Sequence, residues 1–318
     1  MRRVDFDIAP QPPYRLDLTA WALKRREDNT WDRWDPATRK YSRLIVHDGH
    51  PIDVSVSQTG TTNTPLLLVT AIADAESFDV TDDAVRGAVD PVVRNLLGTD
   101  IDLSEFHRMS SADTTLSSLA TKLTGLKPPR YPSLFEALTN AITCQQITLT
   151  AGLRILGRLA AACGTKMKDA VSFPLPENVV QLSAQDLIDL GYSRQKARAM
   201  VELSALAADG ELERSIIADL SDDEAVERLR RLYGVGRWSA EYTLLRGDGR
   251  LNIFPGDDVG VRKHLEQWLG LDHRLNYDGV SRILETWQPF GGMIYLHLLT
   301  ASLVDSGRVV GNEAIEAN

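Results

Sequence analysis

The sequence predicts an α+β fold in which a mixed α/β N-terminal domain with an antiparallel sheet precedes a mostly α-helical part. In roughly the first 110 residues, short alternating or continuous apolar segments recur between turn residues. From about Ser104 onward, apolar residues instead recur at helical spacing behind capping residues. A chain of 318 residues is long enough for two or three domains. We expect three parts, residues 1–110, 111–245 and 246–318.

Four segments of the N-terminal part are rich in apolar residues of the kind that strands use. Turn residues at 47–51 and 59–63 separate three of them, which is typical of an antiparallel sheet. Thr81 and the two aspartates after it then favour the start of a helix over 82–97. The expected strands are 14–19, 43–46, 52–56 and 65–70.

The second half of the chain carries repeated helix signals. Ser133 and Glu136 match a capping box, and the apolar stripe of Leu134, Leu138 and Ile142 follows them. Ser183 and Gly191 bracket a short helix as N-cap and terminator. The further helices expected are 150–163, 196–208, 222–232, 239–246, 259–269, 280–286 and 292–306.

Composition excludes several classes of protein. Hydrophobic residues make up 43% and charged residues 25%, as in globular domains, and no apolar run reaches membrane-spanning length. With only Cys144 and Cys163, we expect no disulfide framework, no iron–sulfur cluster and a cytoplasmic location. The net charge of −9 argues against a protein that coats nucleic acid non-specifically. Yet residues 228–246 hold five arginines and one glutamate, so a local basic face is compatible with the total.

The most informative turn is Gly234-Val235-Gly236, which lies between a basic helix and a second helix. Glycine on each side of Val235 permits positive φ and close approach of a phosphate to the backbone. The N–H groups of the turn, with Arg237 and the start of the helix at Ser239, predict an anion site of the kind that holds a DNA phosphate. The alternative is a simple turn beside a solvated helix face.

Two carboxylates, Asp257 and Asp258, follow about twenty residues later at the start of another helix. Aspartate is favoured at the N-cap, so a purely structural role is one interpretation. A carboxylate near a flipped nucleotide can also stabilise the positive charge that develops on deoxyribose as its base leaves, and can orient an attacking water. Both roles fit the pair if one residue caps and the other acts on the sugar.

Five ordered motifs now make a family resemblance specific. The chain resembles the helix-hairpin-helix DNA glycosylases of the 3-methyladenine DNA glycosylase II type, over about residues 105–305. The resemblance implies that Asp258 is the catalytic aspartate, and it leaves Asp257 as a cap or a supporting group. It also implies double-stranded DNA with damaged bases as the partner, alkylated purines as substrates and no cofactor. The motifs are residues 140–148, 191–197, 234–236, 255–258 and 287–290.

The resemblance extends to the base pocket and the nucleophile. It places Trp238, Tyr242 and Phe290 around the flipped base, where aromatic faces stack on an electron-poor purine and gain a cation–π attraction if it is cationic. Bifunctional relatives carry a nucleophilic lysine at the position of Trp238. The chain is therefore similar to the monofunctional branch, in which water attacks and no Schiff base forms.

Two further assignments follow from the resemblance. The turn at Gln145 and Gln146 would wedge into the duplex where the base has left, and Gln146 aligns with the wedge residue although some relatives have leucine there. Backbone carbonyls of Arg230, Leu232 and Val235 would hold a Na⁺ or K⁺ ion in the hairpin, as relatives do.

Two alternatives remain open beside the alkylpurine glycosylase. One is a glycosylase for deaminated or oxidised purines such as hypoxanthine or 8-oxoguanine, although the missing hairpin lysine counts against the oxidised-guanine version. The other is a non-catalytic helix-hairpin-helix protein that only binds DNA, which has no need of a carboxylate such as Asp258. We expect a monomer with no membrane association, because one copy suffices to flip one base.

Overall fold

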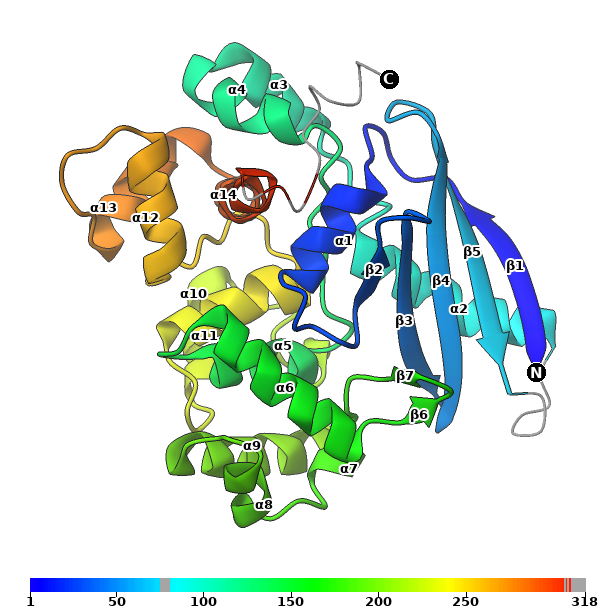
Figure 1. Cartoon of the computed structure of the whole chain (residues 1–318). Coiled ribbons are helices and arrows are strands. Elements are labelled where there is room, and N and C mark those ends of the chain that lie inside the picture. Colours follow the sequence, from blue (N-terminus) through cyan, green and yellow to red (C-terminus); the bar gives the residue numbers. More distant parts are fainter. Residues whose placement is uncertain (75–80, 306, 308, 310–318) are drawn as a thin grey trace.

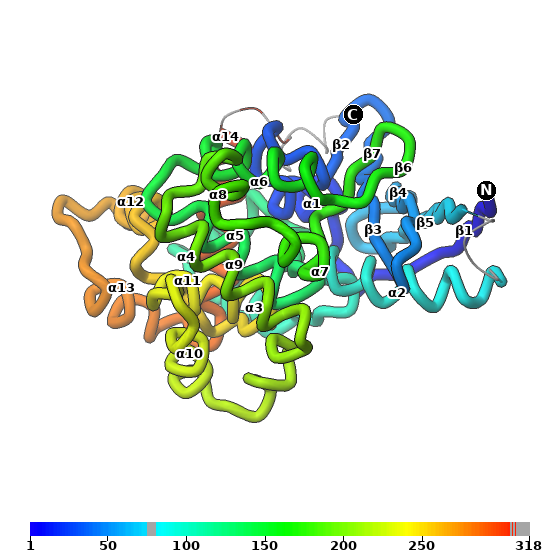
Figure 2. Tube along the Cα trace, turned by 90° about the horizontal axis from the view of Figure 1, so that it is seen from below, coloured from blue at the N-terminus to red at the C-terminus, as the bar shows by residue number. Residues whose placement is uncertain are grey.

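The computed structural model describes residues 1–74, 81–305, 307 and 309. An antiparallel sheet forms one side of the molecule and helices form the rest (Figure 1). The view in Figure 2 places the sheet at one end and α12 (Val259–Trp268) and α13 (Tyr277–Leu284) at the other. The predicted α+β class is confirmed, whereas the boundaries expected at residues 110 and 245 stay a prediction.

The five-stranded sheet has the order β1-β5-β4-β3-β2, and every neighbouring pair of these described strands is antiparallel. The predicted strands 43–46, 52–56 and 65–70 are confirmed as parts of β3, β4 and β5. The predicted turn residues lie at the β3–β4 and β4–β5 connections. The sequence analysis missed β1 and β2, although Val4, Phe6 and Ile8 of β1 alternate inward. The strands are β1 (Arg2–Ile8), β2 (Arg33–Asp35), β3 (Lys40–His47), β4 (His50–Gly60) and β5 (Pro65–Ala73).

The expected strand over 14–19 is wrong, because the chain forms helix α1 (Leu16–Lys24) there. The alternation of Leu16 and Leu18 fits a strand, but the helix is buried on nearly every side, so no polar stripe reveals its period. It lies between the sheet and α14 (Gly291–Asp305), and it contacts both β2 and β3. Helix α2 (Asp82–Leu97) has the predicted bounds, and the Thr81 hydroxyl accepts its N-cap hydrogen bond from Ala84.

The other helices that were predicted individually agree with the structure to within a few residues, whereas α3, α4 and α7 were not predicted individually. The helix expected over 239–246 is divided, since α11 continues over Leu244–Asp248 as a π-helix. A short pair of strands, β6 (Lys166–Met167) and β7 (Ala170–Val171), was not expected. Within the described part of the chain, no helix has the length and apolarity that crossing a bilayer requires. The helices are α3 (Ser104–Ala112), α4 (Thr114–Ala120), α5 (Leu134–Cys144), α6 (Leu149–Cys163), α7 (Pro176–Val179), α8 (Ala184–Asp189), α9 (Arg194–Ala208), α10 (Asp222–Arg230) and α11 (Arg237–Thr243), besides α1, α2 and α12–α14.

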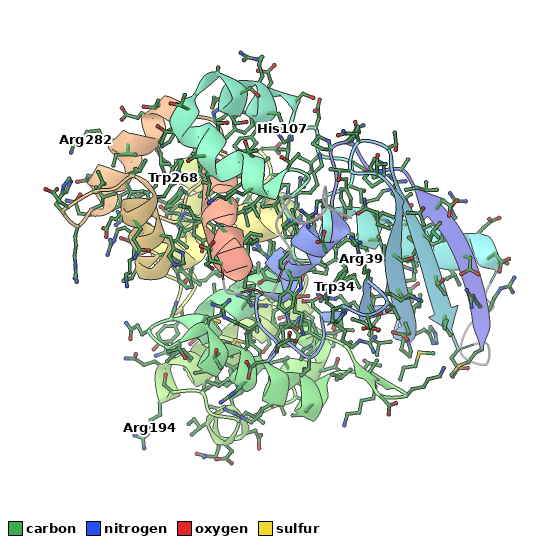
Figure 3. The ribbon with its side chains drawn as sticks, turned by 45° about the horizontal axis from the view of Figure 1, so that its top comes forward. Trp34, Arg39, His107, Arg194, Trp268 and Arg282 are labelled. Carbon is green, nitrogen blue, oxygen red and sulfur yellow. The ribbon has the colours of Figure 1, made fainter. Side chains whose placement is uncertain are left out.

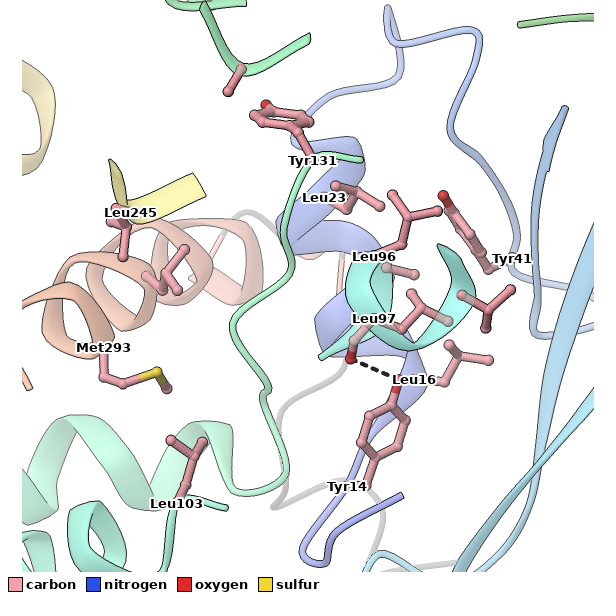
Figure 4. Packing of buried hydrophobic residues seen from close by; sticks show 14 of the residues in the cluster. Tyr14, Leu16, Leu23, Tyr41, Leu96, Leu97, Leu103, Tyr131, Leu245 and Met293 are labelled. Atoms are coloured by element: carbon pink, nitrogen blue, oxygen red, sulfur yellow. Dashed lines mark hydrogen bonds between the residues drawn. The ribbon is translucent and has the colours of Figure 1, made fainter. Parts of the chain in front are cut away.

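A continuous core joins the sheet to the C-terminal helices. It extends from Tyr14 and Leu16 past Tyr131 to Leu245 and Met293, as Figure 4 shows. The Tyr14 hydroxyl donates to the carbonyl of Leu97 at 3.4 Å inside this core. A second core lies among α5, α6, α9 and α10. The N-terminal part and α14 are therefore held together by apolar burial, the dominant favourable contribution to folding.

Tryptophan contacts fix the position of α12. The Trp268 ring lies 5.3 Å from that of Trp287, and its Nε1 donates to the Ser118 hydroxyl of α4 at 3.0 Å. Figure 3 shows Trp268 where α12 meets the α3–α4 pair, whereas Arg194 and Arg282 project outward from the surface. The C-terminal end of α12 is thereby anchored to the rest of the helical part.

A buried ion cluster joins the sheet to α5. Arg43 of β3 donates to Asp32 at 2.9 Å and to Glu136 of α5 at 2.6 Å, and all three side chains are at most 5% exposed. This contact corrects the expected capping box. Ser133 does accept from the Glu136 N–H, but the Glu136 carboxylate turns to Arg43 instead of back to Ser133.

We predict that Arg43→Ala lowers the free energy of unfolding by about 3–5 kcal/mol, because it leaves two carboxylates buried without their cation. Urea denaturation measures this value. Arg108→Ala is the control, since Arg108 forms an exposed pair with Glu105 and should contribute about 1 kcal/mol or less. Equal losses in the two variants would contradict the role assigned to the cluster.

Candidate active site

A cavity of about 960 Å³ opens where the N-terminal and helical parts meet. Its walls come from the end of α1, the α5–α6 turn, the start of α11, the start of α12 and one side of α14. Of the residues predicted for the site, the structure brings Trp238, Tyr242 and Asp258 together in its lining, with Gln145 and Gln146 on another wall. This volume matches that of typical small-molecule sites.

Asp258 is both a helix cap and a cavity residue. Its Oδ1 accepts from the N–H groups of Gly260 and Val261, each at 3.0 Å, as the N-cap of α12. Its Oδ2 accepts from the Tyr295 hydroxyl at 2.8 Å and from Trp238 Nε1 at 3.3 Å. Burial and the Asp258 charge raise the pKa of Tyr295, so that this hydroxyl stays a donor. The carboxylate is thus held in one orientation from both sides.

Of the two roles expected for Asp257, cap or supporting group, the contacts of the structure fit the second. Asp258 is the N-cap of α12, whereas Asp257 accepts from Arg237 Nε at 2.8 Å. The Arg237 guanidinium also lies over the Tyr277 ring, 3.6 Å from its centroid. Asp257 therefore neutralises Arg237 and orients it at the cavity edge.

Two of the three predicted pocket aromatics pack together in the wall. The Trp238 and Tyr242 rings stack with centroids 5.4 Å apart, because residues four apart share one face of α11. Phe290 does not line this cavity, in contrast to the expectation. Its ring packs edge-on against Phe106 at 5.5 Å, just before α14 begins. Tyr295, one turn into α14, is the aromatic residue that reaches Asp258 instead.

Sequence reasoning missed Arg25, which lies just after α1. Its Nη1 donates to the Tyr242 hydroxyl at 3.0 Å, and its Nη2 donates to Asn140 Oδ1 at 2.6 Å. The Tyr242 and Tyr131 hydroxyls also share a hydrogen bond of 2.9 Å. No pattern in the sequence announces Arg25, since no element was predicted for residues 20–42.

Only one of the two hairpin glycines has the positive φ that the sequence analysis allowed for. Gly234 has φ of +79°, and a Cβ there would lie 2.7 Å from that of Ala199, so glycine is required. Gly236 is instead extended, with φ −90° and ψ 179°, and a Cβ there would meet no atom within 4 Å. Val235 is buried between the flanking helices. The space at Gly236 faces outward, which leaves the backbone open to a ligand.

The α5–α6 turn is attached to the hairpin. Gln145 Nε2 donates to the Gly234 carbonyl and to the Ser239 hydroxyl, each at 2.8 Å. Ser239 as a whole is 1% exposed, so this structure leaves neither its hydroxyl nor its backbone open to the phosphate contact that was predicted for it. Gln146 is exposed with φ of +55°, and Ile147 beside it is 40% exposed. Ile147 is a second projecting residue that the sequence analysis missed, although an apolar residue in a polar turn is a usable signal.

No cluster of three or more histidine, cysteine, aspartate or glutamate side chains suited to a metal ion occurs among the described residues. The carbonyls named for a monovalent cation belong to the turn that Gly234 closes. The Leu232 carbonyl accepts from the Val235 N–H at 3.1 Å and keeps a second lone pair. A cation in this turn stays a prediction.

Glu241 is a buried carboxyl behind the site. The Tyr277 hydroxyl donates to its Oε1 at 2.6 Å, and the residue is 4% exposed. Burial raises the pKa of Glu241 to about 7, although the Tyr277 hydrogen bond and the Arg237 charge partly offset the effect. The folded protein therefore holds this proton more tightly than the unfolded chain does.

We predict that Glu241→Gln removes a pH dependence of stability. In the native protein, the free energy of unfolding falls as pH rises from about 4.5, the pKa of this group in the unfolded chain, to about 7, its pKa in the folded protein. Between pH 5 and pH 8, the free energy of unfolding of the variant should therefore rise by on the order of 3 kcal/mol relative to that of the native protein. Urea denaturation at both pH values measures the gain. Glu211→Gln, an exposed control, should show none.

Comparison with known proteins agrees with this geometry. Residues 139–289 match the family described as the HhH-GPD superfamily of base excision DNA repair proteins. A putative DNA-3-methyladenine glycosylase, YfjP of Bacillus subtilis strain 168, is 27% identical over 185 residues, which are 58% of this chain and 64% of that protein. The chain thus matches less than two thirds of the length of such curated relatives.

Solved structures show the same fold over nearly the whole chain. The 3-methyladenine DNA-glycosylase from Archaeoglobus fulgidus has a TM-score of 0.78 at 23% identity, with coverage of 96% of this chain and 99% of that one. The Clostridium acetobutylicum 8-oxoguanine glycosylase/lyase in complex with dsDNA has a TM-score of 0.72 at 15% identity, with coverage of 96% and 99%. Residues 139–289 therefore match the model of the HhH-GPD superfamily, within a chain that has the fold of these solved DNA glycosylases.

Proposed function

We propose that this protein is a monofunctional DNA glycosylase of base excision repair that removes alkylated purines of the 3-methyladenine type. The observation that supports this most directly is Asp258, which reaches the same cavity as the stacked pair Trp238 and Tyr242. A flipped purine would stack on these rings and present its sugar to the carboxylate. The names of the relatives favour the same substrate class.

The chemistry follows from the position of that carboxylate. As the N-glycosidic bond breaks, positive charge develops on the deoxyribose, and the Asp258 charge stabilises it. The cap bonds from Gly260 and Val261 and the Tyr295 hydrogen bond hold the carboxylate in place before the reaction begins. Water is the nucleophile, because Trp238 offers no amine where a lyase would carry its lysine.

Double-stranded DNA is the proposed partner. The open backbone at Gly236, with Arg237 beside it, would hold a phosphate on the damaged strand. Gln146 and Ile147 would enter the duplex at the vacated position, while Gln145 ties this wedge to the hairpin. The hairpin and the wedge would thus be held together as one rigid unit, with the flipped nucleotide between them.

The remaining assignments belong to the same proposal. The enzyme would work as a cytoplasmic monomer without a catalytic cofactor. A Na⁺ or K⁺ ion on the carbonyls of Arg230, Leu232 and Val235 would add positive charge beside the bound phosphate. A non-catalytic DNA-binding role is less well supported, because capping of α12 uses only Oδ1 of Asp258 and leaves the oriented Oδ2 in the cavity without a purpose.

We predict that Asp258→Asn lowers the release of free base from methylated duplex DNA by at least about 100-fold, because the charge that stabilises the sugar is lost. The amide oxygen can still cap α12, so the variant should fold. Asp257→Asn, which removes the neighbouring carboxylate, should reduce the rate by less than about tenfold. Equal rates for Asp258→Asn and the native protein would remove Asp258 from catalysis, and DNA binding without base release by the native protein would favour the binding-only alternative.

We predict that Gly236→Ala weakens binding to duplex DNA by at least about tenfold, because a methyl group would occupy the space through which the phosphate approaches. Thermal unfolding should be nearly unchanged, since the backbone there is extended and the new Cβ meets no atom of the protein. Fluorescence anisotropy with a labelled duplex measures the affinity. Gly87→Ala, also in open space but on α2, should bind as the native protein does.

A further inference from the structure

Tyr277, the first residue of α13, lies between the start of α11 and the segment that leads to Asp258. Its ring is covered by the guanidinium of Arg237, whose Cζ lies 3.6 Å from the ring centroid. On another side, the ring packs against the backbone of Gly256, because a Cβ there would come within 2.9 Å of it. One aromatic side chain thus contacts both the residue that follows the hairpin and the segment that carries the catalytic carboxylate.

A buried acceptor fixes the Tyr277 ring. The Tyr277 hydroxyl donates to Oε1 of Glu241 at 2.6 Å, and Glu241 is 4% exposed. Glu241 and Arg237 are four residues apart on α11, so they lie on the same side of that helix. The ring is therefore attached to α11 at its hydroxyl while its face supports the arginine one turn earlier.

Arg237 is held on one edge and one face, yet it keeps donors for a ligand. Asp257 accepts from its Nε at 2.8 Å, and the Tyr277 ring covers one face of the guanidinium. The side chain is still 41% exposed and lines the cavity. No acceptor among the described residues lies within hydrogen-bond distance of either Nη nitrogen of Arg237. A guanidinium presents such nitrogens as a planar fork that matches phosphate oxygens.

We propose that Tyr277 is a positioning residue for DNA binding, which holds the Arg237 guanidinium so that its Nη groups face a phosphate of the duplex. This inference rests on the proposed function, which places a phosphate at Gly236 and Arg237. A side chain that is oriented before binding loses less freedom when the ligand arrives, so the contact contributes more to affinity. Lysine would not substitute for Arg237, because an ammonium group has neither the plane nor the fork.

The test is a double-mutant cycle between Tyr277→Leu and Arg237→Met. Fluorescence anisotropy measures binding to a labelled duplex that carries a tetrahydrofuran abasic analogue. Arg237→Met should weaken binding about tenfold and lower the slope of log affinity against log salt concentration by about 1, as expected for one lost phosphate contact. Tyr277→Leu should weaken binding about three- to tenfold, because the guanidinium loses the ring that orients it. The double variant should bind no more weakly than Arg237→Met, since Tyr277 acts through Arg237.

Three further variants separate positioning from bulk and charge. Tyr277→Phe keeps the ring under the guanidinium and should lose less affinity than Tyr277→Leu. Arg237→Lys keeps the charge without the fork and should bind at least about threefold more weakly than the native protein. Arg86→Met is the matched control, because Arg86 of α2 also lies over an aromatic ring, that of Phe6 at 5.3 Å, at the end of the molecule opposite α13 (Figure 2). It should bind as the native protein does.

Two results would overturn the positioning proposal. One is a double variant in which the two separate losses multiply, because Tyr277 would then act independently of Arg237. The other is native affinity in Arg237→Lys, which decides the matter even if circular dichroism shows that Tyr277→Leu does not fold. Failure of the native protein to release any base from methylated duplex DNA would instead overturn the proposed glycosylase function, and the binding measurements would still decide the role of Tyr277.

Discussion

The site depends on how Asp258 divides its two oxygens. One oxygen closes the first turn of α12 through two backbone N–H groups, and the other faces the cavity and accepts from Tyr295 and Trp238. Three helices, α11, α12 and α14, must therefore keep their relative positions for the carboxylate to stay in place. Capping keeps the Asp258 carboxylate rigid at little extra cost in free energy, because α12 needs a cap in any case.

The sheet-containing part completes the cavity as well as supporting it. It contributes Ala22, Arg25 and Arg26 through the end of α1, although the family match begins only at residue 139. Arg43 and Glu136 hold this part against α5, and Arg246 donates to the Ala22 carbonyl across the same junction. Local opening of the junction would separate the α1 side of the cavity from the side that carries Asp258.

Charge within the cavity is arranged by position. Asp258 lies at the start of α12, whereas Arg25 lies just after α1 and Arg246 lies in the π-helical continuation of α11. A carboxylate held in one orientation stabilises positive charge that develops beside it without reorganising during a reaction.

The sequence by itself determined the elements and motifs whose signals are local. Turn residues predicted the β3–β4 and β4–β5 connections, Thr81 predicted the start of α2, and the ordered motifs identified the hairpin and Asp258. Tertiary structure decided whatever depends on a distant partner. Segment 14–19 became helical inside a shell of surrounding elements, Glu136 turned to Arg43, Phe290 packed on Phe106, and Arg25 reached Tyr242 from more than 200 residues away. Capping and turn formation involve neighbours in the chain, so a pattern reveals them. Burial and charge pairing depend on which surfaces meet, and no local pattern records that.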